Sequence, residues 1–141
     1  MNKKLVNVSV IVIVAIAALC TAAFFVLKNS LIEDSNKEPT IDEVLEASVD
    51  INDVITNLQG DSIVRISLKL ETDSKKAKEE LEKRDFQVKD STIELLANLK
   101  ADEIEGAKGK VAFKNKLKEK VNAYMREGQI IKVYITSFNL Q

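Results

Sequence analysis

The sequence predicts an α+β protein in which one N-terminal transmembrane helix precedes a small domain with an antiparallel hairpin, two helices and a C-terminal strand. Three patterns support this fold class. A predominantly apolar segment without charged residues runs from Leu5 to Leu27 and is long enough to cross a bilayer. Apolar and polar residues alternate strictly within Ser62–Thr72, which is typical of a half-buried strand. Helical spacing of apolar residues recurs between that strand and the C-terminus, which indicates amphipathic helices.

The apolar segment is predicted to be a retained membrane anchor. As a helix, Leu5–Leu27 spans about 34 Å, against roughly 30 Å for a hydrocarbon core. A cleaved signal peptide is the first alternative, since Thr21-Ala22-Ala23 imitates a cleavage site, but apolar residues continue to Leu27. A lipoprotein is the second alternative, but Leu19 stands directly before Cys20, where that processing wants a small residue. The retained helix fits best.

The charge distribution predicts the orientation of this anchor. Lys3 and Lys4 precede the apolar segment, and the first acidic residue is Glu33. Basic residues flanking a helix remain in the cytoplasm, so the N-terminus is expected inside and the rest outside. Four segments follow, namely a cytoplasmic tail (1–4), a transmembrane helix (5–27), a polar tether (28–39) and an extracytoplasmic domain (40–141).

The domain is expected to begin with a short helix. Thr40 and Glu43 have the spacing of a capping box, and a helix is predicted from there to about Val49. Its apolar face comprises Ile41, Val44, Leu45 and Val49. Two interpretations of this face are equally open: it packs on its own domain, or it binds a partner.

A β-hairpin is predicted next. Asp53–Leu58 is a candidate strand, and Gln59–Asp61 forms a turn in which Gly60 can adopt a positive φ. In the second strand, Ser62–Thr72, one face is apolar and the other polar. The apolar face comprises Val64, Ile66, Leu68 and Leu70, and the polar face Arg65, Ser67, Lys69 and Glu71.

Two helices are expected between the hairpin and the C-terminal strand. Asp73-Ser74 caps the first helix, and an interruption is expected near Arg84–Phe86. Three i,i+4 ion pairs are predicted on the exposed side of this helix. The pairs are Lys75–Glu79, Lys76–Glu80 and Lys78–Glu82, and the apolar stripe is Val88, Leu95, Leu96 and Leu99. The segment Lys100–Gly109 breaks the pattern before the second helix, which should end at Gly128. This helix has an apolar stripe of Phe113, Leu117, Val121 and Tyr124 and lysines at 108, 110, 114, 116, 118 and 120.

The lysine-rich helix and the terminal strand each leave an alternative open. The lysines form either a solvated face, which is favoured, or a contact with anionic headgroups. The terminal strand, Gln129–Gln141, is predicted to be apolar on both faces, which favours a strand covered on both sides by helices or by another subunit. One face would carry Ile131, Val133 and Ile135, and the other Tyr134, Phe138 and Leu140.

The residues that usually carry chemistry are scarce. The chain has no histidine and a single cysteine, Cys20, which removes the commonest general base and metal ligand. Carboxylates occur as neighbours in Glu79-Glu80 and Asp102-Glu103, but in stretches expected to be exposed, and Ser74 and Ser91 have no histidine to activate them. We predict no enzymatic activity, no catalytic, cofactor-binding or metal-binding residues, no cofactor, no small-molecule substrate and no nucleic-acid partner.

Three stretches give the chain a resemblance to a known family. They are the Asn57-Leu58 end of the first strand, the Ser62–Thr72 strand leading into a helix, and the C-terminal sequence from Val133 to Gln141 (VYITSFNLQ). The chain resembles FliL, the flagellar basal-body-associated membrane protein family. Asn139 departs from the family pattern, in which an apolar residue is usual.

The resemblance implies a fold and a function. It implies a domain similar to the stomatin/prohibitin type, homo-oligomeric rings around stator units of the MotA/MotB type, and support of torque during swarming and swimming. It implies a location in the cytoplasmic membrane at the flagellar basal body, and no catalytic residues. The alternative from another class is a membrane-anchored ligand-binding or sensor module of a cell-envelope system.

Overall fold

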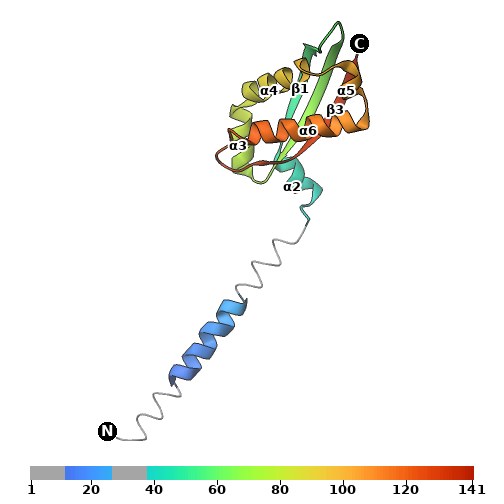
Figure 1. The fold of residues 1–141 in the computed structure, drawn as a ribbon. Coiled ribbons are helices and arrows are strands. Elements are labelled where there is room, and N and C mark those ends of the chain that lie inside the picture. Colours follow the sequence, from blue (N-terminus) through green and yellow to red (C-terminus); the bar gives the residue numbers. More distant parts are fainter. Residues whose placement is uncertain (1–11, 27–37) are drawn as a thin grey trace, which may run out of the picture. The chain divides into compact units, whose positions relative to one another are not determined.

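The computed structural model describes residues 12–26 and 38–141. The chain divides into two units, Met1–Pro39 and Thr40–Gln141. In the first unit, residues 12–26 form a helix whose side chains are exposed (Figure 1). Within the two described ranges, no helix combines the length and the apolar character needed to cross a membrane. Residues 5–11 and 27 of the predicted transmembrane span lie outside the described residues. The predicted tail 1–4 and most of the predicted tether 28–39 lie outside them as well.

The second unit contains a three-stranded antiparallel sheet with strand order β1-β2-β3. Its elements in chain order are α2 (Ile41–Glu46), β1 (Ser48–Asn57), β2 (Ile63–Thr72), α3 (Lys75–Lys83), α4 (Asp85–Ala97), α5 (Ala101–Glu105), α6 (Ala107–Asn122) and β3 (Ile130–Leu140). Helix α4 packs on β1 and α6 packs on β3, so that both helices cover the same face of the sheet (Figure 1). The α+β class with an antiparallel hairpin is confirmed.

The central strand β2 supplies the middle of the core. Val64, Ile66, Leu68 and Leu70 are all completely buried, as the alternating pattern predicts. The polar face differs from the prediction at Glu71, which is buried and whose carboxylate accepts the Tyr134 hydroxyl of β3 at 2.7 Å. The glycine turn is also confirmed, since Gly60 has a φ of 101°.

The first strand is longer than predicted, and the preceding helix is shorter. Helix α2 ends at Glu46, and Val49 belongs to β1, where it lies opposite Leu70. A β-bulge separates Ile51 from Val54, and Asp53 within it has a φ of 52°. A bulge interrupts the period-two alternation, so the pattern hid the part of β1 that precedes Asp53.

The predicted two-faced terminal strand is wrong. Residues directly opposite each other in an antiparallel pair share a face, and Phe138 lies opposite Ile66, Ile135 opposite Leu68 and Val133 opposite Leu70. Two register shifts in the β2–β3 pairing put all these apolar side chains on the helix-covered face. The open face of β3 is mostly polar, and it includes Asn139, which is exposed opposite Arg65.

The helices refine the remaining predictions. Ser74 caps α3 and the interruption falls at Arg84, as expected. The segment expected to break the helical pattern contains α5, and Gly109 lies inside α6. A glycine suits position 109 because a Cβ there would overlap the backbone carbonyl of Glu103. Gly128 is not a helix C-terminal glycine, since α6 ends at Asn122; it has a φ of 136° in the following loop.

Of the three predicted ion pairs of α3, only one is present. Lys78 and Glu82 lie 3.9 Å apart. Lys75 instead pairs with Glu46 of α2 at 2.7 Å, and Glu80 pairs with Arg84 at 2.7 Å. The charges of α3 therefore serve partly to connect elements that are distant in sequence.

Candidate interaction surfaces

Helix α2 is fixed at both of its ends. At the start, the Thr40 N–H donates to the Glu43 carboxylate at 2.7 Å and the Glu43 N–H donates to the Thr40 hydroxyl at 3.3 Å, which confirms the capping box. At the end, the Thr72 N–H and hydroxyl both donate to the Ala47 carbonyl, at 2.9 and 2.7 Å. The Lys75–Glu46 pair adds a second link and lowers the pKa of Glu46, chiefly through its hydrogen bond.

The apolar side of α2 is nevertheless uncovered. None of the residues of α2 is buried, and the side chains of Ile41 and Leu45 are 69% and 50% exposed. They lie one helical turn apart and therefore on one side. Asp42, Glu43 and Glu46 make the same helix acidic. Among the described residues, the domain does not cover this face, which favours the partner-binding interpretation of the two left open by the sequence.

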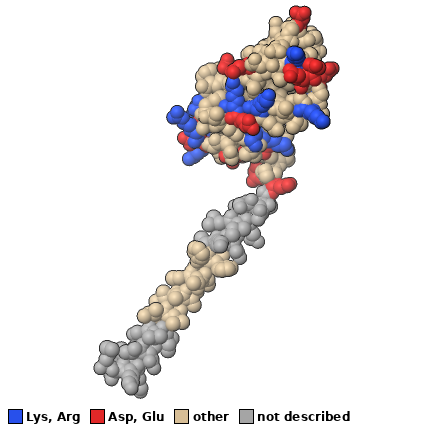
Figure 2. Space-filling view, in the orientation of Figure 1, with Lys and Arg blue, Asp and Glu red and all other residues tan. Residues whose placement is uncertain are grey.

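The lysine-rich helix α6 uses several of its lysines inside the domain. The Lys110 ammonium lies 4.4 Å from the centroid of the Phe138 ring, Lys118 donates to the Ile131 carbonyl at 2.9 Å, and Lys120 pairs with Glu94 at 2.5 Å. The other three lysines, at 108, 114 and 116, are exposed or half-buried. Figure 2 shows basic side chains gathered across the middle of the domain, where α6 runs.

Three side chains of α6 contact β3. Asn122 donates to the Ile130 carbonyl at 3.0 Å and accepts from the Ile130 N–H at 2.7 Å. Lys118 and Lys110, one and three turns earlier, reach Ile131 and Phe138. Unpaired strand edges invite pairing with another chain, and lysines are a common protection. Half of the lysine pattern therefore has a structural explanation that does not need a membrane.

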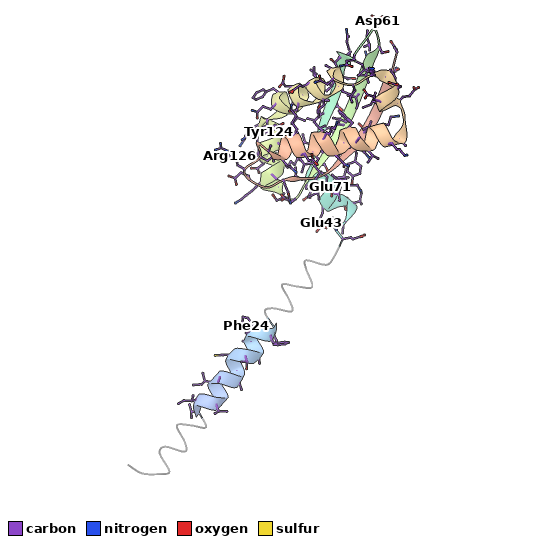
Figure 3. The ribbon with its side chains drawn as sticks, viewed as in Figure 1. Phe24, Glu43, Asp61, Glu71, Tyr124 and Arg126 are labelled. Carbon is purple, nitrogen blue, oxygen red and sulfur yellow. The ribbon has the colours of Figure 1, made fainter. Side chains whose placement is uncertain are left out.

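The carboxylate of Glu80, predicted to pair with Lys76, instead fixes the loop after α6. Glu80 of α3 accepts the N–H groups of Arg126 and Glu127, the latter at 2.7 Å, as well as the Arg84 guanidinium. These hydrogen bonds, first from Glu127 and then from Arg126, hold the pKa of Glu80 below its ordinary value. Tyr124 and Arg126 lie together at this end of α6, beside α3 (Figure 3). Nothing in the spacing of Glu80 from residues 126 and 127 could have revealed this contact.

Several of the carboxylates and hydroxyls considered as chemical candidates make hydrogen bonds that stabilise the fold. Glu80 is engaged with the loop, Glu103 accepts the Lys100 N–H at 2.7 Å, and Ser74 accepts the Ala77 N–H as a helix cap. Ser91 is buried on α4. In the part of the chain that the structure describes, no group of three or more acidic or cysteine side chains could hold a metal ion.

Comparisons with known proteins agree on one family. The family model for flagellar basal body-associated protein FliL matches residues 48–141. A flagellar protein FliL of Bacillus subtilis is 55% identical over all 141 residues, which is the full length of both chains. A flagellar protein FliL of Aquifex aeolicus is 29% identical over 77 residues, covering 55% of this chain and 48% of that protein.

Proposed function

Because the chain belongs to the FliL family of flagellar basal body-associated proteins, we propose that it is a motor accessory protein that assembles around MotA/MotB-type stator units. In this role it supports torque during swarming and swimming. The observation that carries the proposal is the 55% identity with a flagellar protein FliL across both full lengths. The family is one of flagellar accessory proteins and not a known enzyme family.

A ring of copies is the form of assembly that the family resemblance implies. The stomatin/prohibitin-like character of the domain belongs to the same proposal. Its physical support here is the acidic helix α2, which is rigidly capped and presents Ile41 and Leu45 to solvent. A capped helix with an uncovered apolar side suits a protein whose work is binding to other proteins.

Membrane anchoring is the second part of the proposal. Residues 5–27 would cross the cytoplasmic membrane once, with the N-terminus inside and residues 40–141 outside, because Lys3 and Lys4 precede the apolar segment. In a Cys20→Ala background, Asn36→Cys should react with a membrane-impermeant thiol reagent in intact or wall-free cells, whereas Asn2→Cys should not. Labelling at position 2 alone would contradict the proposed orientation. The domain would then lie inside the cell and could not reach the outer part of a stator.

The functional test is deletion combined with localisation. Deletion should leave flagellar filaments assembled, while swarming, or swimming under viscous load, weakens. A fluorescent fusion should form spots at flagellar bases that require stator proteins for full retention. Unchanged motility at every load, or an evenly spread fusion, would contradict the proposal and favour an envelope sensor or ligand-binding module.

A further inference from the structure

The domain carries a second apolar surface whose charge is opposite to that of α2. We define the basic side of α6 as Lys108, Val111, Lys114 and Lys118 together with Ile131 of β3. Val111, Lys114 and Lys118 follow at spacings of three and four and share one side of the helix. Lys118 donates to the Ile131 carbonyl, which places the start of β3 next to this side.

The basic side of α6 combines exposed apolar side chains with lysines. Val111 is 51% exposed and Ile131 is 39% exposed, so apolar atoms are available between the lysines. Glu119 is the only acidic residue of α6 against six lysines. Lys118 is already ordered by its hydrogen bond to β3, which lowers the conformational entropy that is lost when a partner binds.

We propose that α2 of one copy docks on the basic side of α6 in the next copy, with Leu45 and Ile41 against Val111 and Ile131. This inference rests on the proposed function, because it supplies the contact between copies which that function needs. The two surfaces match in kind: each carries two exposed apolar side chains, on one surface among carboxylates and on the other among ammonium groups. Complementary charges favour this pairing over contacts between two acidic or two basic surfaces.

The contact joins two different surfaces and is therefore heterologous. A heterologous contact repeats from copy to copy and closes into a ring when the rotation between neighbours permits. Each copy then contributes one α2 and receives one. The arrangement explains why α2 has well-formed caps yet buries no residue of its own in the domain. An acidic α2 is also poorly suited to an anionic lipid surface.

Disulfide cross-linking in membranes from cells that produce the full chain tests the contact. In a Cys20→Ala background, Leu45→Cys combined with Val111→Cys should give, on mild oxidation, a ladder of dimers and larger species. Neither single variant should give a ladder. The matched control is Leu45→Cys combined with Ile55→Cys, because Ile55 lies on the open side of the sheet and is 51% exposed, like Val111.

Charge reversal on the basic side provides an independent measurement. Lys114→Glu in the cross-linking background should lower the ladder several-fold, whereas Lys76→Glu, at an exposed lysine of α3, should leave it unchanged. Equal ladders from the Val111 and Ile55 pairs, no ladder from the Val111 pair, or dimers from Leu45→Cys alone would each overturn the proposal. Equal effects of the two charge reversals would do the same.

The localisation of the fusion separates this inference from the proposed function. Spots at flagellar bases without the Leu45–Val111 ladder would refute the docking of α2 and leave the stator role standing. A specific ladder in cells where the fusion spreads evenly would support the contact and refute the stator role.

Discussion

Replacing Glu80 by glutamine tests whether one carboxylate holds the loop that follows α6. The carboxylate accepts two backbone N–H groups and the Arg84 guanidinium, with distances between 2.7 and 3.1 Å. Glutamine keeps the shape but loses the charge and exposes an NH₂ group to these donors. Hydrogen bonds to a charged group contribute roughly 1.5–3 kcal/mol, so we expect Glu80→Gln to cost about 2 kcal/mol of unfolding free energy.

The expected effect is large enough for thermal unfolding to measure. For a domain of about 100 residues, 2 kcal/mol corresponds to a fall in Tm of about 8–16 °C. The domain 40–141 contains the whole hydrophobic core and is suitable for circular dichroism. Glu79→Gln is the matched control, since Glu79 is the neighbouring exposed carboxylate on α3. Equal Tm values for the two variants would refute the role assigned to Glu80.

The pH dependence of stability provides a second readout for the same residue. The pKa of Glu80 is lowered in the folded state, so at acidic pH this carboxyl group binds fewer protons in the folded chain than in the unfolded chain. Its contribution is therefore complete above the unfolded pKa, near 4.5, and is lost as the pH falls through the folded pKa. The difference in stability between wild type and Glu80→Gln should accordingly be largest at neutral pH and shrink in acid. A constant difference down to strongly acidic pH would mean that the carboxylate charge is not the cause.

Three further changes test the packing around α6 and β3. Gly109→Ala should lower stability by about 1–3 kcal/mol, because its Cβ would overlap a backbone carbonyl of α5, whereas Gly106→Ala meets nothing within 4 Å and should be neutral in thermal unfolding. Phe138→Ala should lower the free energy of unfolding by about 2 kcal/mol, because Phe138 is half-buried on the core face and a fully buried ring contributes roughly 3–5 kcal/mol. An unchanged Tm with lost self-association in sedimentation would place Phe138 outside the core. Asn122→Ala removes the side chain that bonds the N–H and the carbonyl of Ile130, and it should lower the free energy of unfolding by about 1–3 kcal/mol. Hydrogen exchange at the start of β3 should become faster; unchanged exchange there would show that Asn122 does not protect this strand edge.

Several features were predictable because they depend on local chemistry. The Thr40–Glu43 capping box and the glycine turn at Gly60 both involve residues within three positions of each other. The strand β2 was predictable because it is central and packed on one face, so its composition repeats with the period of the backbone. Together these patterns predict a helix, a turn and a strand, which is why the α+β class was predicted correctly.

Other features required the tertiary structure. The strand β1 begins before Asp53, because a bulge shifts its register without a trace in the composition. Bulges also turn the large aliphatic side chains of β3 except Ile131, together with Phe138, to the core, while Tyr134 lies opposite Lys69 on the open face. Likewise, the sequence pattern of α2 is the same whether its apolar side packs on the domain or faces solvent. Only the tertiary structure shows that Ile41 and Leu45 are exposed.

The sequence by itself determined the family, the fold class and the location of the main helices and strands, since these depend on residue identity and on short-range periodicity. Only the tertiary structure decided which apolar residues remain exposed and which charges are engaged inside the domain. Glu80 and Lys118 illustrate the reason, since their partners lie 46 and 13 residues away, and the distance between residues so far apart in the chain is set by the packing of whole elements. Which surfaces remain open for a partner depends on that packing.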